Sequence, residues 1–259
     1  MRIVLIAITA ALLTAGCATP DRIANPSFPV TRRQAESDLR RMKAAPVKAE
    51  RPIVFLAGIG DPSVSSGALR RAIMPGLDAS IAEVDFFDEV TFPGARQKLL
   101  REVAAQLHAD INNLPEVDVV AFSMGGLVAR ETALADDSGR RLPVRRLFTI
   151  STPHQGARLA GIPIGTPIGD DMIPTSEFLE QLRTARRTYE LYCYTRLDDV
   201  TVGEEFAAPE GVALWWLPTP SGEWAHAAAF DDARIQADIA RRLRGEAPFS
   251  TLPAAPLPD

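Results

Sequence analysis

The stretch Val117-Asp118-Val119-Val120-Ala121-Phe122-Ser123-Met124-Gly125-Gly126 decides the fold, and a helical pattern follows it over residues 127–135. The apolar run before Ser123 predicts a buried strand. A serine on so tight a strand-to-helix turn exposes its oxygen, and the residues two before and two after it must be small because strand and helix pack closely. Ala121 and Gly125 meet this condition. Ser123 is therefore a candidate nucleophile, and a serine- and glycine-rich turn without chemistry is the alternative.

Strand and helix patterns alternate on both sides of this turn. Strands are predicted at 53–57, 81–87, 117–122, 146–150, 189–195 and 212–217, and helices at 68–74, 95–114, 127–135, 176–187 and from 231 onward. Such alternation favours an α/β fold with a mostly parallel sheet and helices on both of its faces.

Length, charge and motifs limit the possible functions. The 259 residues suffice for one large domain. The net charge of −5 gives no reason to expect a nucleic-acid partner. Neither a glycine-rich phosphate loop nor an H-E-x-x-H motif occurs in the sequence. We therefore expect neither a cofactor nor a metal ion.

An acid and a base follow Ser123 in the order serine, aspartate, histidine that this kind of site uses. Asp198 and Asp199 come directly after a predicted strand, and His226 precedes the last predicted helix. His154 is the competing base, but it precedes the acids, and His108 falls within a helix pattern. Order therefore favours His226. Adjacent side chains point in different directions, so only one of the two aspartates should reach it.

Three segments resemble one known group of enzymes. Residues 122–130, F-S-M-G-G-L-V-A-R, resemble the H-S-M-G-G-L-V-A-R elbow of bacterial triacylglycerol lipases and GPI inositol-deacylase-like hydrolases. Residues 151–156, S-T-P-H-Q-G, resemble their G-T-P-H-x-G segment, and 197–200, L-D-D-V, resemble their acid loop D-E-I-V. The resemblance implies an α/β-hydrolase fold over about residues 51–245 and places the acid on Asp198.

The resemblance also implies two backbone donors for an oxyanion hole. One is the Met124 amide, directly after the nucleophile. The other is the Ile59 amide, because 55–60, F-L-A-G-I-G, is similar to the H-G-x-x loop of these enzymes with Ala57 in place of the histidine.

These residues predict a serine ester hydrolase of the lipase or carboxylesterase type, acting through a Ser123, His226 and Asp198 triad and an acyl-enzyme. A lipid or another acyl ester is the expected substrate. Two alternatives remain open: an acyltransferase or thioesterase with the same triad, and an inactive hydrolase fold that only binds.

The two ends of the chain differ from the predicted domain in composition. Residues 1–16 fit a secretory signal peptide. The boundary up to Cys17 resembles the lipobox of bacterial lipoproteins, which implies a lipid on Cys17, a membrane partner and an outer-membrane location facing the periplasm. Residues 17–50 are expected to form a tether with some local helix around 38–43, and the proline-rich residues 246–259 a loose tail.

Two further features concern packing. Cys193 lies in an apolar run and is expected to be a buried structural residue. Residues 156–175 mix glycine, proline and isoleucine, so no regular helix fits throughout. They form either one apolar wall of an acyl pocket or a loop packed permanently over the sheet.

Overall fold

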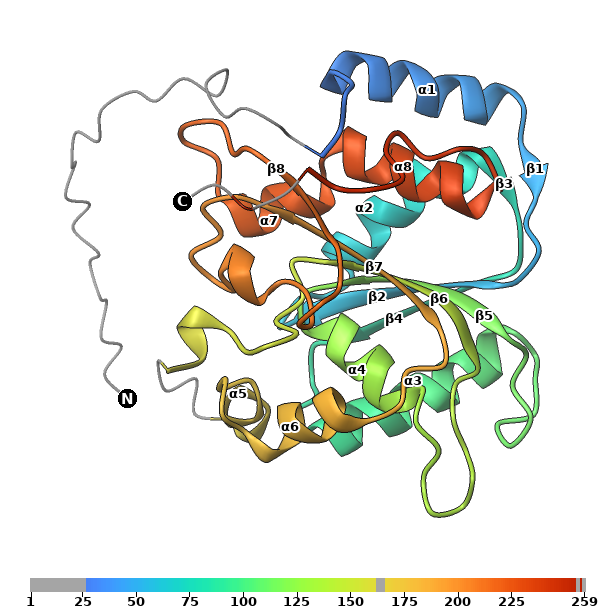
Figure 1. Cartoon of the computed structure of the whole chain (residues 1–259). Helices are drawn as coiled ribbons and strands as arrows, with labels where there is room; N and C mark the ends of the chain where they lie inside the picture. Colours follow the sequence, from blue (N-terminus) through green and yellow to red (C-terminus); the bar gives the residue numbers. More distant parts are fainter. Residues whose placement is uncertain (1–26, 162–165, 255–256, 258–259) are drawn as a thin grey trace, which may run out of the picture.

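A six-stranded parallel sheet forms the centre of the computed structural model, which describes residues 27–161, 166–254 and 257. The strand order is β4-β2-β5-β6-β7-β8, and Figure 1 shows helices packed above and below the sheet. The strands are β2 (Ile53–Ile59), β4 (Ile81–Phe86), β5 (Val117–Phe122), β6 (Val144–Ile150), β7 (Glu190–Arg196) and β8 (Leu214–Leu217). All six predicted strands are present.

The helices divide between the two faces of the sheet (Figure 1). On one face lie α3 (Phe92–Gln106), α4 (Met124–Thr132), α5 (Pro167–Asp171) and α6 (Glu177–Thr184). On the other lie α1 (Arg32–Ala44), α2 (Val64–Ile73), α7 (Ala225–Phe230) and α8 (Ala233–Leu243). A small parallel pair, β1 (Val47–Lys48) with β3 (Leu77–Asp78), and the 3-10 turns η2 (Met74–Gly76), η3 (Arg158–Gly161) and η4 (Glu204–Phe206) complete the order.

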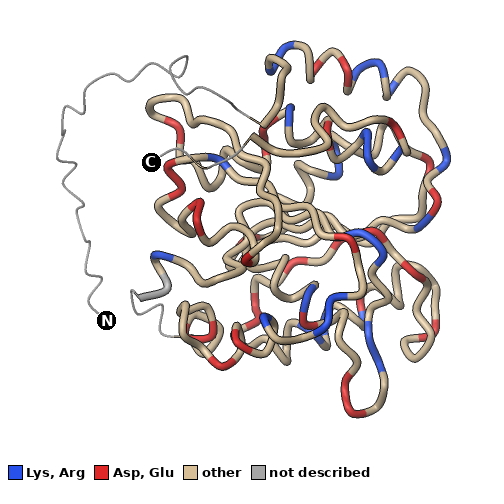
Figure 2. The backbone as a smooth tube through the Cα atoms, in the orientation of Figure 1, with Lys and Arg blue, Asp and Glu red and all other residues tan. Residues whose placement is uncertain are grey.

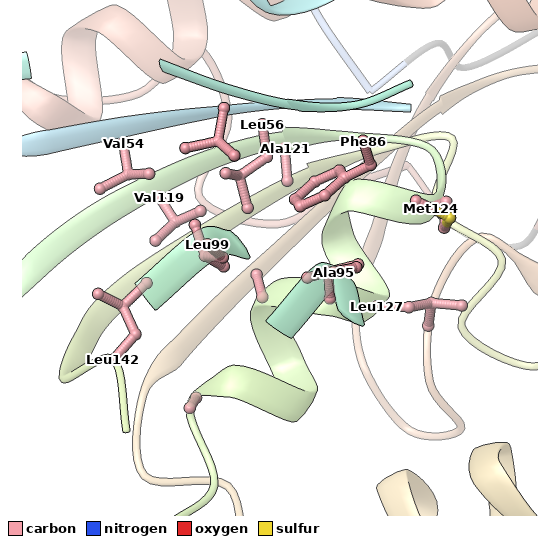
Figure 3. Close-up of a cluster of buried hydrophobic side chains, with 14 of the residues drawn as sticks. Val54, Leu56, Phe86, Ala95, Leu99, Val119, Ala121, Met124, Leu127 and Leu142 are labelled. Atoms are coloured by element: carbon pink, nitrogen blue, oxygen red, sulfur yellow. The ribbon is translucent and has the colours of Figure 1, made fainter. Parts of the chain in front are cut away.

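Each face of the sheet has its own apolar core. Figure 3 shows the core below the sheet, where Val54, Leu56, Val119 and Ala121 meet side chains of the two helices α3 and α4. Every residue of β5 is buried, because helices cover this central strand on both sides. Its one charged residue, Asp118, accepts a hydrogen bond of 2.9 Å from Arg146 Nε. The covered central strands hold the end of β5, and with it Ser123, in a fixed position.

Over residues 27–50 the predicted tether is a packed segment, and the local helix expected around 38–43 lies within α1. Thr31 caps α1 by accepting from the Gln34 amide, and this helix of 13 residues packs on α8 with Ala35 and Met42 buried. The Ser27 amide donates to the Trp216 carbonyl at 3.2 Å. The reason is tertiary: a largely polar helix forms when its few apolar side chains meet a partner helix.

The tail is also more ordered than expected over its described part. Glu246 forms ion pairs with Arg41 and Arg244, and Trp216 Nε1 donates to the Ala254 carbonyl at 2.8 Å. Residues 246–254 therefore pack against the domain. The predictions of a signal peptide over 1–16 and of a lipid on Cys17 lie outside the described residues.

Helix α3 ends earlier than its apolar spacing predicts. The predicted helix spans 95–114, whereas α3 ends at Gln106 and His108 adopts a left-handed φ of 51°. Leu107 and Ile111 still pack against the core from the turn that follows, which explains why the apolar pattern continues past the helix.

The segment 156–175 divides into short elements. Its described residues form η3 and α5, and residues 162–165 lie outside the described part. Ile168 and Met172 are buried in the core that includes Leu127 and Leu179. For these two residues the structure agrees with a segment packed against the domain rather than with a pocket wall.

Within residues 27–161, 166–254 and 257, no helix is both long enough and apolar enough to span a bilayer.

Candidate active site

Ser123 lies on the tight turn between β5 and α4. It is the first residue after the strand, its φ is 52° and its ψ is −131°, and Met124 begins the helix. Helix and strand approach so closely that a Cβ at Gly125 would stand 2.4 Å from the Ala57 carbonyl oxygen. Glycine is therefore required at 125, whereas Ala121 fits at the earlier position, where it is fully buried.

Three side chains form a hydrogen-bonded chain at this edge of the sheet. His226 Nε2 lies 3.1 Å from Ser123 Oγ, and His226 Nδ1 lies 2.8 Å from Asp199 Oδ2. Ser123 follows β5, Asp199 follows β7, and His226 lies in α7 beyond β8. Because parallel strands all end at one edge, residues 103 positions apart in the chain meet there. The arrangement has the geometry of a nucleophile, a base and an orienting acid.

The prediction that Asp198 is the acid is wrong, because the aspartate that contacts His226 is Asp199. Asp198 adopts a left-handed φ of 63° and its side chain is exposed, while the next residue, Asp199, is fully buried and bonds His226. The turn at Asp198 directs the two neighbouring side chains apart. Asp199 is fixed further because its Oδ1 accepts from the amides of Thr201 and Val202, at 3.0 and 3.1 Å.

The surroundings of Asp199 keep it ionised. Burial alone raises the pKa of this carboxyl, but the hydrogen bond and charge of His226 and the amides of Val202 and Thr201 outweigh burial and lower the pKa overall. An ionised Asp199 accepts a hydrogen bond from His226 Nδ1, which leaves Nε2 free to accept from Ser123.

His154, the competing base, lies elsewhere. It is buried, with Nδ1 3.1 Å from Arg130 Nη1 and Nε2 2.9 Å from Thr149 Oγ1. Burial and the charges of Arg130 and Arg187 lower its pKa well below the ordinary value. His154 is therefore a neutral packing residue in this arrangement, and the choice of His226 on chain order agrees with the geometry. His108, the third histidine, is exposed on the turn after α3.

The two amides expected to form the oxyanion hole belong to different elements. Met124 is the first residue of α4, and Ile59 is the last residue of β2. The end of β2 lies against the nucleophile, because a Cβ built on Gly58 would stand 3.1 Å from Ser123 Cβ. Both amides thus belong to segments adjacent to Ser123.

Two residues that sequence reasoning did not single out hold the site together. Thr152 Oγ1 donates to the Ser123 carbonyl at 2.8 Å. Arg196, only 1% exposed, bonds Asp232 at the start of α8 and Glu223 in the loop before His226. Arg196 thereby connects the end of β7 to the loop that precedes the histidine. Thr152 lies within the S-T-P-H-Q-G segment, but that resemblance does not show its contact with Ser123, and the partners of Arg196 are 27 and 36 residues away.

Backbone strain gathers at the same edge. Four of the five non-glycine residues with positive φ follow the carboxyl ends of sheet strands: Ser63, Ser123, Ser151 and Asp198. Each of these conformations costs about 1–3 kcal/mol, and they persist where surrounding contacts hold them.

Other candidate chemistry is limited. Cys193 is buried, and burial raises the pKa of its thiol to about 12, which agrees with the expected structural role. Among the side chains that the structure describes, no group of three or more His, Cys, Asp or Glu is placed to hold a metal ion.

Comparison with known proteins places this site in context. The family model described as "PGAP1-like alpha/beta domain" matches residues 96–161, which include the Ser123 turn and the T-P-H-Q-G segment. A comparison with curated proteins gives no match.

Three solved structures share the architecture. Bacillus licheniformis lipase BlEst2 in its propeptide form has a TM-score of 0.54 and 16% identity, covering 79% of this chain and 52% of that one. Phospholipase PlaB from Legionella pneumophila has a TM-score of 0.55 and 13% identity, covering 76% and 60%. Aspergillus fumigatus lipase B has a TM-score of 0.50 and 13% identity, covering 93% and 64%.

In each of these three comparisons the aligned region spans less than two thirds of the solved chain, and at such identities the likeness concerns the fold. The parallel sheet, its flanking helices and the serine on the strand-to-helix turn agree with the family match and with these neighbours. The chain therefore has the α/β-hydrolase fold, with a segment similar to the PGAP1-like alpha/beta domain.

Proposed function

We propose that the protein is a serine ester hydrolase in which Ser123 is the nucleophile, His226 the general base and Asp199 the orienting acid. The observation that carries this proposal is the continuous hydrogen-bonded chain from Ser123 Oγ through His226 to Asp199. The neighbouring lipases and phospholipase agree with ester chemistry on this fold.

The reaction follows from the positions of these atoms. His226 Nε2 takes the proton of Ser123 Oγ as the oxygen attacks the ester carbonyl, and Asp199 stabilises the imidazolium. The amides of Met124 and Ile59 are proposed to donate to the oxyanion. The tetrahedral intermediate collapses by breaking the bond to the alcohol oxygen, which receives the proton from His226. Water then repeats the sequence on the acyl-enzyme and releases the acid.

The edge around Ser123 supports a lipid-like substrate. Seven large apolar side chains are exposed in the described residues, and six of them follow the carboxyl ends of sheet strands: Val64, Phe87, Val90, Leu159, Val200 and Trp224. Exposed apolar side chains that share the edge of a reactive serine suit contact with acyl chains. We therefore propose a lipid ester as the substrate class.

Replacing Phe87 and Val90 together by serine should weaken hydrolysis of a long-chain ester presented as micelles about tenfold. Each large apolar side chain contributes up to about 1.5–3 kcal/mol when it is buried against apolar material. Turnover of a soluble acetate ester should stay within about twofold by the same reasoning. The matched control is Leu252→Ser, an exposed apolar residue that belongs to the tail and not to a segment that follows a sheet strand. Equal losses on the two substrates would contradict the proposed lipid contact.

Covalent labelling tests the enzymatic proposal directly. A fluorophosphonate should modify the purified protein at Ser123, because the probe requires an activated serine nucleophile, and peptide mapping identifies the residue. Labelling at another serine or none at all would favour the alternative of an inactive hydrolase fold that only binds. Product analysis in the presence of alcohols or thiols separates hydrolysis from acyl transfer by the same triad.

The anchor is a separate proposal that rests on sequence alone. We infer from the leader and the lipobox-like boundary that Cys17 carries a lipid and holds the domain on a bacterial envelope membrane. Mass spectrometry of the mature N-terminus tests it, and an unmodified Cys17 would contradict it.

A further inference from the structure

A cavity of about 400 Å³ lies between α4, the chain that links α6 to β7, and the loop before β8. Four arginines and one glutamate carry the charges of its lining: Arg130, Arg183, Arg186, Arg187 and Glu210. Tyr189 and Val212, also in the lining, precede the first residues of β7 and β8. This arginine cavity therefore lies toward the amino ends of those strands, whereas Ser123 follows the carboxyl end of β5.

Arg130 has unusual partners for a buried arginine. It is 7% exposed, and its guanidinium bonds the His154 ring and the Leu182 carbonyl, both neutral groups. By contrast Arg196, which is 1% exposed, bonds two carboxylates. No carboxylate of the described residues lies within 4.0 Å of the Arg130 guanidinium nitrogens. Glu210 lines the same cavity but forms no ion pair with Arg130, so an anion that reached the Arg130 guanidinium would supply the close counter-charge that this buried group lacks.

The neighbouring arginines add to this positive field. Arg183 is partly neutralised by Glu180, with 2.6 Å between Arg183 Nη2 and Glu180 Oε1. Arg186 and Arg187 form no ion pair with any residue that the structure describes. The positive charge of Arg187 reaches the interior of the domain. Burial, the charge of Arg130 and the charge of Arg187 together lower the pKa of the buried His154. Figure 2 colours this basic run after α6 blue, and it contrasts with the net charge of −5 on the whole chain.

We propose that the arginine cavity binds a phosphate group carried by a small molecule. Guanidinium groups donate paired hydrogen bonds to phosphate oxygens, and several arginines together match its double charge. The volume falls within the range of about 300–1,000 Å³ that is usual for small-ligand sites. The site is separate from the proposed ester site, so the two proposals stand or fall independently.

Calorimetric titration of the full chain with inorganic phosphate and with glycerol 3-phosphate, at constant ionic strength, tests the proposal. We expect saturable binding of one equivalent. Arg186→Gln with Arg187→Gln should weaken the binding at least tenfold, because two charge-assisted contacts are lost. Both side chains are exposed, so this double variant should fold. The matched control is Arg33→Gln with Arg40→Gln, two exposed arginines of α1, which should bind like the wild type.

Vesicles identify the source of the phosphate group. Phosphatidylcholine vesicles containing phosphatidic acid, compared with pure phosphatidylcholine, present the same group on a lipid. Binding that depends on Arg186 and Arg187 with glycerol 3-phosphate supports a soluble ligand, and the same dependence with phosphatidic acid alone supports a lipid headgroup. Absence of saturable binding with every probe overturns the proposal. So does equal weakening in the Arg33 and Arg40 control, which would show attraction by overall charge only.

Discussion

Replacing Ser123 by alanine should lower ester turnover roughly 10⁴- to 10⁶-fold, as expected when a catalytic nucleophile is removed. The Ser123 hydroxyl is the group that His226 Nε2 contacts at 3.1 Å, so alanine leaves the base without a nucleophile to activate. Alanine adopts the same strained turn at a similar cost, because both residues carry a Cβ. The fold should therefore be preserved.

The measurement is kcat/KM on a soluble ester, with thermal unfolding to check the fold. Ser63→Ala is the matched control, since Ser63 also follows a strand end and has a positive φ, but bonds Asp85 rather than a histidine. It should retain turnover within a few-fold. A folded Ser123→Ala protein with near wild-type turnover would exclude Ser123 as the nucleophile.

Replacing Asp199 by asparagine should lower kcat by about 10⁴, the loss expected when the acid of such a triad becomes an amide. The amide removes the negative charge that stabilises the imidazolium, and its NH₂ group favours the wrong tautomer of His226. Asp199 is buried at the end of β7, 2.8 Å from His226 Nδ1.

The neighbouring carboxylate supplies the control for this prediction. Asp198→Asn changes the same chemical group one residue earlier, on an exposed side chain. It should keep kcat within a few-fold of the wild type. A larger loss in Asp198→Asn than in Asp199→Asn would reverse the assignment and restore the acid implied by resemblance to the D-E-I-V loop.

The nucleophile and the base could be predicted because local pattern and chain order mark them. Ser123 stands between an apolar run and small residues, and His226 precedes the last long helix. The acid could not be chosen in the same way. Asp198 and Asp199 are equivalent in composition and order, and the choice depends on the left-handed φ at 198 and on the amides of Thr201 and Val202.

The sheet was predictable from sequence, and the N-terminal helix was not. The six strands can be recognised in the sequence because each is a run rich in apolar residues. Helix α1 is mostly polar, with the sequence R-R-Q-A-E-S-D-L-R-R-M-K-A. Its place depends on α8 and on the pairing of Arg41 with Glu246, which are distant in sequence. The same holds for Arg130, because its partners lie 24 and 52 residues away.

The concentration of positive-φ residues at the carboxyl edge has a consequence for engineering this scaffold. Strain at Ser63, Ser123, Ser151 and Asp198 lowers stability where the reactive groups are assembled. Directed evolution toward heat tolerance should select glycine at Ser63, Ser151 or Asp198, because glycine adopts a positive φ without the strain of a Cβ, whereas Ser123 cannot change without loss of the nucleophile. Each such gain would also loosen the loops that aim His226 and Asp199. Substitutions that raise thermal stability without lowering turnover should therefore lie at the amino-terminal edge of the sheet and on the outer faces of the helices, where added rigidity does not affect the reactive groups.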